Sequence, residues 1–176
     1  IDFLDQILDA GVKVLKLEGR GRSPEYVKTV TRCYKEAAAA VQNGTYTSEK
    51  IHSWKTDLGK VYNRGFWDGY YLGRRLGEWS PVHGSSAAKE KVFVGKVLHF
   101  YPKAGVAHVR IKAGKITTDD HLLIIGKKTG VAEPAIESLW VDEKPVHEVN
   151  KGTDCTIKLN QAVQEGDKIY VWEDRG

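Results

Sequence analysis

The second half of the chain consists of six short segments in which apolar and polar side chains alternate. They are VFVGKVLHFY, GVAHVRIKA, HLLIIGK, AIESLWV, GTDCTIKLN and DKIYVWE, between Val92 and Glu173. Each has the length of a strand, none has a helical period, and turn residues separate them. Short strands at this spacing predict a small antiparallel β-barrel, because closing the sheet removes its exposed edges.

The first half of the chain has helical and strand-like segments in turn. Apolar residues recur at helical spacing in DFLDQILDA, and Gly11 follows as a left-handed cap. The β-rich run Val12–Glu18 predicts a short strand. Ser23 is the N-cap of a second helix, which an Asn-Gly pair ends, and a third helix begins at Thr47 or Ser48. This order is typical of a parallel βα fold, although it is too little to close a barrel unaided.

A polar linker separates the two halves. SPVHGSSAAKEK, residues 80–91, has the small, proline and glycine residues of an interdomain segment. We therefore expect an α+β protein in three parts. These are a βα region with an aromatic loop over residues 1–79, the linker over 80–91, and the small β-barrel over 92–176.

Composition narrows the class of protein. A net charge of +4 and an isoelectric point of about 8.9 permit an anionic partner without the clustered basicity of a nucleic-acid binder. No apolar run has the length of a membrane span and no signal peptide begins the chain, so we expect a cytoplasmic protein with no membrane partner. The sequence has no methionine, so we expect Ile1 to follow an N-terminal remainder of the same polypeptide, which is then a partner of this part.

No pattern of a hydrolytic or metal site is present. The sequence has neither HExxH nor GxSxG, and Cys33 and Cys155 lack metal-ligand spacing, so we expect two buried thiols and no metal. His99 and His108 face each other across a predicted hairpin that turns at Pro102–Gly105. Two such histidines could bind a metal, but strand histidines are more often solvent-facing.

A segment in which glycines and arginines alternate, residues 19–22, follows the predicted strand. Groups at the carboxyl end of a strand in a βα fold commonly bind ligands, and a helix N-terminus attracts anions. Glu18 and Arg20 are therefore candidate catalytic residues, and Arg20, Arg22 and Ser23 are candidate anion-binding residues for a carboxylate or phosphate. The alternative is that Glu18 and the arginines form an ion pair that braces the loop.

An aromatic loop, NRGFWDGYYLGRR, combines rings with guanidinium groups, as a contact for single-stranded RNA would. The candidate RNA-binding residues are Arg64, Phe66, Trp67, Tyr70, Arg74 and Arg75. Alternatively, these rings pack the third helix onto the barrel. A basic stripe in the second half, which is commonly only a solvated face, comprises Lys112, Lys115, Lys127 and Lys128.

Two motifs, LKLEGRGRSPEYVKTVTRCYKEA and NRGFWDGYYLG, resemble the collagenase-like peptidase family U32. The matching positions are Lys16, Glu18, Gly19, Arg20, Ser23, Pro24, Glu25, Tyr26, Asn63, Arg64, Gly65, Phe66, Gly69 and Gly73. The resemblance covers about the first half of the chain. It implies a TIM-like (βα) barrel of which Val12–Val41 is the last strand and helix, followed by a β-barrel similar to the second domain of translation elongation factors.

The resemblance also implies a function for the parent protein. Members of the family resemble RNA-modification enzymes that support 5-hydroxylation of a tRNA uridine or an rRNA cytidine, with prephenate as a carboxylate metabolite and an iron-sulfur cluster. The cysteine signature of that cluster is absent here, so we expect no cofactor in this part and no turnover by it alone. Alternatives are a genuine peptidase whose β-barrel docks protein substrate, and a module that only stabilises its parent.

Overall fold

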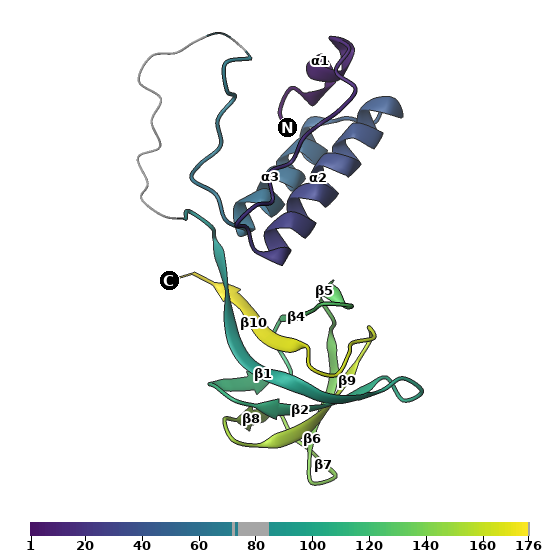
Figure 1. The fold of residues 1–176 in the computed structure, drawn as a ribbon, viewed down its shortest axis with the longest axis vertical. Helices are drawn as coiled ribbons and strands as arrows, with labels where there is room; N and C mark the ends of the chain where they lie inside the picture. Colours follow the sequence, from purple (N-terminus) through teal and green to yellow (C-terminus); the bar gives the residue numbers. More distant parts are fainter. Residues whose placement is uncertain (72, 74–84, 176) are drawn as a thin grey trace. The chain divides into compact units, whose positions relative to one another are not determined.

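The computed structural model describes residues 1–71, 73 and 85–175. They form two compact units, which we call the helical unit (Ile1–Ala88, with Arg175) and the β unit (Lys89–Asp174). Figure 1 shows helices in the first and strands in the second, so the predicted α+β class is confirmed. The division falls within the stretch 80–91 that the sequence analysis gives as a linker, of which residues 80–84 lie outside the described residues.

The helical unit contains α1 (Leu4–Asp9), α2 (Pro24–Gln42) and α3 (Ser48–Lys60). All three helices are predicted from the sequence and are confirmed. Gly11 follows α1 with a φ of 93°, in the left-handed region that ends a helix. The Thr47 side chain accepts a hydrogen bond from the Lys50 amide at 3.4 Å and caps α3. None of the described helices is both long and apolar enough to cross a membrane.

The three helices enclose an apolar core. Its buried members are Leu4, Cys33, Ala37, Ala40, Trp54 and Leu58. The indole nitrogen of Trp54 donates to the Glu36 carboxylate at 2.9 Å, so the buried ring keeps a polar partner. Burial raises the pKa of the Cys33 thiol, which favours its neutral form. The prediction that Cys33 is a buried packing residue is confirmed.

The predicted strand Val12–Glu18 is wrong for this chain. The segment between α1 and α2 has no strand ladder, and it pairs with no other described segment. A parallel strand needs a neighbour that satisfies its backbone groups, and the described chain places none beside it. The segment remains open to solvent, with Val14 80% exposed. The arginine segment that follows is therefore not a strand end.

The β unit contains ten strands: β1 (Lys89–Tyr101), β2 (Val106–Ile111), β3 (Lys115–Thr117), β4 (Leu122–Gly126), β5 (Gly130–Ala132), β6 (Ile136–Val141), β7 (Lys144–Pro145), β8 (Glu148–Asn150), β9 (Asp154–Leu159) and β10 (Lys168–Asp174). The six predicted strands are β1, β2, β4, β6, β9 and β10, and they are confirmed. The other four have only two or three residues, which is too short for an alternating pattern to reveal.

Eight strands form one antiparallel sheet in the order β5-β4-β10-β1-β2-β9-β6-β7, and β3 pairs with β8. Ile116 of β3 and Val149 of β8 belong to the same buried core as the large sheet, so the small ribbon covers that core. Among the described residues no ladder joins the edge strands β5 and β7. The antiparallel strands and the single core of the predicted barrel are thus confirmed, and its closure stays a prediction.

The first two strands form the predicted hairpin. β1 ends at Tyr101, β2 begins at Val106, and His99 lies directly opposite His108, as the sequence predicts. β10 pairs along the other edge of β1, and Figure 1 shows these two strands side by side. The hairpin therefore forms the middle of the large sheet.

Two glycines in the β unit lie where no side chain fits. A Cβ on Gly95 of β1 would overlap the backbone carbonyl oxygen of Arg110 on β2. A Cβ on Gly126 of β4 would overlap the carboxylate of Asp167. That carboxylate is buried, and it accepts hydrogen bonds from the Thr129 hydroxyl at 2.5 Å and the Gln164 amide at 2.9 Å.

Candidate functional site

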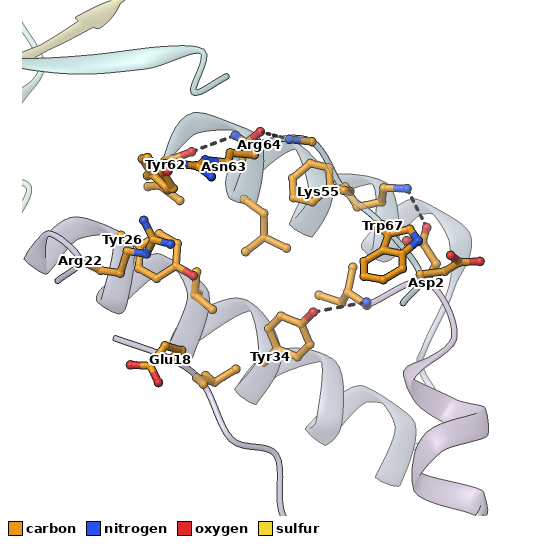
Figure 2. A pocket seen from close by; sticks show the side chains of 18 of the residues that line it. Asp2, Glu18, Arg22, Tyr26, Tyr34, Lys55, Tyr62, Asn63, Arg64 and Trp67 are labelled. Carbon is orange, nitrogen blue, oxygen red and sulfur yellow. Dashed lines mark hydrogen bonds and ion pairs between the residues drawn. The ribbon is translucent and has the colours of Figure 1, made fainter. Parts of the chain in front are cut away.

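The helical unit contains a cavity of about 680 Å³. It is lined by residues 1–3 and 16–18, by Arg22, by Tyr26, Val30 and Tyr34 of α2, by Lys55 and Leu58 of α3, and by residues 61–68. The three α2 residues follow one another at four-residue spacing, so they lie on one helix face. Figure 2 shows Arg22, Tyr62 and Arg64 at one side of the cavity and Lys55, Asp2 and Trp67 at the other.

Two arginines hold the hydroxyl of Tyr62. The Arg22 guanidinium carbon lies 4.1 Å from the centre of the Tyr62 ring and 5.6 Å from that of Tyr26. The Arg64 Nε donates to the Tyr62 hydroxyl at 2.9 Å. Hydrogen bonding from Arg22, and then from Arg64, lowers the pKa of Tyr62. This corner of the cavity therefore places two guanidinium groups beside one phenol, and these positive charges suit an anionic ligand.

We expect Arg22→Gln to raise the pKa of Tyr62 towards its ordinary value of 10.0, because the N–H that stabilises the phenolate is lost. A pH titration of the labelled tyrosine ring by NMR measures this pKa. Arg32→Gln is the matched control, because Arg32 pairs instead with Glu36 and Asp57. A Tyr62 pKa that moves equally in both variants would contradict the assigned contact.

Only one of the three anion-binding residues predicted from the sequence lines the cavity. Arg22 lines the cavity, whereas Arg20 and Ser23 are not among its lining residues. Glu18 does line the cavity, and its carboxylate accepts a hydrogen bond from the Arg20 backbone amide at 2.7 Å. This contact is to the backbone of Arg20 and closes a tight turn. The alternative of an ion pair between Glu18 and an arginine side chain is not seen among the described ion pairs. A catalytic role for Glu18 or Arg20 stays a prediction.

The aromatic loop opens at the mouth of the cavity. Phe66 and Trp67 line it while remaining 54% and 55% exposed. Trp67 packs edge-on against Tyr70 with ring centres 5.0 Å apart, and Tyr70 is 60% exposed. Arg74 and Arg75 lie outside the described residues. The rings that are described thus have accessible faces, and their RNA contact stays a prediction.

Sequence reasoning missed Tyr62, Lys55 and Tyr34 as cavity residues. Tyr62 immediately precedes the NRGF motif, and Tyr34 continues the helical spacing of Tyr26. Both residues could therefore have been identified from the residues near them in the sequence. Lys55 could not: its ammonium pairs with Asp2 at 2.8 Å, across 53 positions of sequence. Only the packing of α3 beside the N-terminal segment places it there.

Two histidines of the β unit, His99 and His147, have polar partners on the protein surface. No group of three potential metal ligands occurs among the described residues. His147 contacts the Thr118 hydroxyl at 2.6 Å and the Asp119 carboxylate at 3.8 Å, in the order of a hydroxyl–imidazole–carboxylate relay. The side chains of His147 and Asp119 are 67% and 85% exposed, so bulk water would screen any such relay. Cys155 is also inert, because burial raises the pKa of its thiol to about 12.

Comparison with known proteins places the chain in a family. The family model described as Peptidase family U32 matches residues 1–81. A collagenase of Porphyromonas gingivalis W83 is 45% identical over 175 residues, which are 99% of this chain and 42% of that protein. An uncharacterized protease of Methanocaldococcus jannaschii is 33% identical over 162 residues, 90% of this chain and 39% of that protein.

The same family occurs among solved structures. The C-terminal domain of a Geobacillus thermoleovorans protein assigned to the U32 peptidases aligns with a TM-score of 0.42 and 17% identity, covering 45% of this chain and 90% of that domain. The chain spans about two fifths of the length of the curated relatives given above. The family model matches residues 1–81 and the collagenase relative aligns along almost the whole chain, so peptidase family U32 is the family that the comparisons support for this chain.

Proposed function

We propose that the helical unit binds single-stranded RNA at the rim of its cavity. The main support for this proposal is that the half-exposed rings of Phe66 and Trp67 line the same cavity as Arg22 and Arg64. Aromatic faces stack on unpaired bases of any sequence, and guanidinium groups bind phosphate oxygens.

The cavity itself suits a small anionic ligand. Its volume of about 680 Å³ lies within the usual range of small-molecule sites, roughly 300–1,000 Å³. Arg22 and the Tyr62 hydroxyl supply polar contacts at one end, and Leu17, Val30 and Leu58 supply apolar walls. A carboxylate metabolite such as prephenate is the ligand that we propose for it.

For the whole protein we propose RNA modification, namely 5-hydroxylation of a uridine in tRNA or a cytidine in rRNA. In that protein Val12–Val41 would be the last strand and helix of a TIM-like barrel, and the strand would gain the neighbours that it lacks here. The β unit would correspond to the second domain of elongation factors. We expect this part to be inactive alone.

An iron-sulfur cluster does not fit the residues of this chain. A cluster needs several thiolates that converge on one point. Cys33 and Cys155 are both buried, and they belong to different units. Any such cluster would therefore be bound by other residues of the whole protein.

RNA binding by the loop can be tested with Trp67→Ala. We expect the affinity of the chain for a single-stranded RNA oligonucleotide to fall about fivefold to a hundredfold, the usual value of one base–aromatic stack. Arg64→Gln should flatten the dependence of log affinity on log salt by about 0.7, because one phosphate contact is lost. Fluorescence anisotropy at several salt concentrations measures both effects.

The conservative variant Trp67→Phe is the control, since it keeps a stacking ring and should keep most of the affinity. Equal affinities for wild type, Trp67→Ala and Arg64→Gln would refute the loop as an RNA contact.

A second candidate function follows from the relatives that are named collagenase, at 45% identity. Binding of denatured collagen, with no binding of RNA, would favour a peptidase whose β unit docks protein substrate.

A further inference from the structure

The β unit has a row of cations on the outer face of its sheet. Lys168 of β10 lies directly opposite Lys96 of β1, and Lys96 lies opposite Arg110 of β2. Residues that face each other across a ladder project from the same side of a sheet. Ile169 and Ile111, the next residues along their strands, are fully buried, so the three cations project from the opposite side, towards solvent.

Lys96 and Lys168 form a like-charge pair across the β1–β10 ladder. Like charges directly opposite in neighbouring strands destabilise a sheet. Arg110, at the end of the row, pairs with Asp154 at 2.9 Å. Neither Lys96 nor Lys168 has a carboxylate partner within residues 1–71, 73 and 85–175, and both are exposed. A like-charge pair without a carboxylate partner is a place where a bound anion would neutralise the charge.

Two aromatic rings lie on the same face, beside the cations. Phe93 of β1 lies opposite Tyr170 of β10, and Tyr170 is two residues from Lys168 along its strand. The ring centres are 5.7 Å apart in an edge-to-face arrangement, and Phe93 is 36% exposed. The ammonium of Lys91 lies 5.3 Å from the centre of the Tyr170 ring. Rings and cations therefore alternate over β10 and β1.

We propose that this face of the β unit, formed by Lys168, Lys96, Arg110, Phe93 and Tyr170, binds single-stranded nucleic acid. The cation row holds phosphates and the two rings stack on bases. An acidic protein segment would use the cations alone, so the adjoining rings favour nucleic acid. The face belongs to a different unit from the cavity and goes beyond the function proposed above, which concerns the helical unit.

The test uses the whole chain and one charge reversal. Lys96→Glu converts the like-charge pair with Lys168 into an opposite-charge pair, so we expect the melting temperature to rise by about 2–6 °C. The same variant should lose affinity about tenfold for an oligouridylate and an oligodeoxythymidylate of about 12 nucleotides. RNA and DNA should respond alike, because phosphate contacts and stacking do not involve the 2′-hydroxyl. A variant that is more stable and yet binds more weakly cannot be explained by misfolding.

Two further variants complete the design. Lys127→Glu, in the turn between β4 and β5, makes the same change in net charge away from the cation row and should alter affinity by about twofold or less. Tyr170→Ala should lower affinity about fivefold to a hundredfold, whereas Tyr170→Phe should retain it. Anisotropy measurements and thermal melts on the same samples give both readouts.

The outcomes separate this inference from the proposed function. If Trp67→Ala lost affinity and Lys96→Glu did not, the proposal for this face would be wrong and the proposal for the cavity would hold. The reverse pattern would overturn the cavity rim and leave this face. A loss in Lys96→Glu with none in Tyr170→Ala would mean a general polyanion surface, and the assignment to nucleic acid would be wrong. If the chain bound neither oligonucleotide, the proposal for this face of the β unit would also be wrong.

Discussion

Gly95→Ala is expected to lower the free energy of unfolding of the β unit by about 3 kcal/mol, the upper end of the usual cost of overpacking and a large part of the stability of a domain of this size. The added methyl group would overlap the carbonyl oxygen of Arg110 on the neighbouring strand. That oxygen belongs to the backbone and cannot rotate aside, so β1 and β2 must separate at the centre of the sheet. The pairing of Gly95 with Ile111 would be lost with it.

Chemical denaturation followed through the amide signals of β1 and β2 measures this effect. Gly114→Ala is the control for an added methyl group without a clash, because nothing lies within 4 Å of a Cβ on Gly114, although its φ of 56° lies in the left-handed region. Its cost should be only about 1 kcal/mol, the usual penalty for alanine in the left-handed region. Equal costs for the two variants would show that the approach of β1 to β2 is not tight.

Gly126→Ala is expected to cost about 2–4 kcal/mol, by a different route. Its methyl group would displace the buried carboxylate of Asp167, which accepts hydrogen bonds from Thr129 and Gln164. The displaced carboxylate would leave both donors without their acceptor. Because the clash involves a side chain, removing that side chain should relieve it.

A double-mutant cycle checks this reason. Asp167→Ala alone should also destabilise the β unit by about 2–4 kcal/mol, since two donors lose their partner. The double variant Gly126→Ala with Asp167→Ala should cost clearly less than the sum of the two single changes. Additive costs would mean that Gly126 is needed for a reason other than room for the carboxylate. Thr129→Val, which removes one donor, should cost only about 1 kcal/mol.

Helix ends and the six longer strands follow from local chemistry. Gly11 ends α1 because glycine enters the left-handed region without strain, and Thr47 begins α3 because its hydroxyl accepts a backbone N–H. Alternating side chains identify β1 and β2, and the turn residues between them set the register that brings His99 opposite His108. These features depend on residues that are near one another in the sequence.

The segment Val12–Glu18 shows the limit of such reasoning. Its composition favours a strand, but a strand exists only when another segment satisfies its hydrogen bonds, and none of the described residues does so. The position of the arginines depends on the same missing neighbour. Arg22, and not Arg20, lines the cavity, and the sequence alone does not distinguish the two.

The sequence by itself determined where the helices and longer strands lie, the presence of a division near residues 80–91, and the U32 motifs. The tertiary structure alone decided which side chains share a site: Tyr62 between Arg22 and Arg64, Lys55 beside Asp2, and Lys96 opposite Lys168. Local order is encoded in the propensities and caps of adjacent residues. A site is a set of distances between residues far apart in the chain, and only the packing of helices and the pairing of strands fixes those distances.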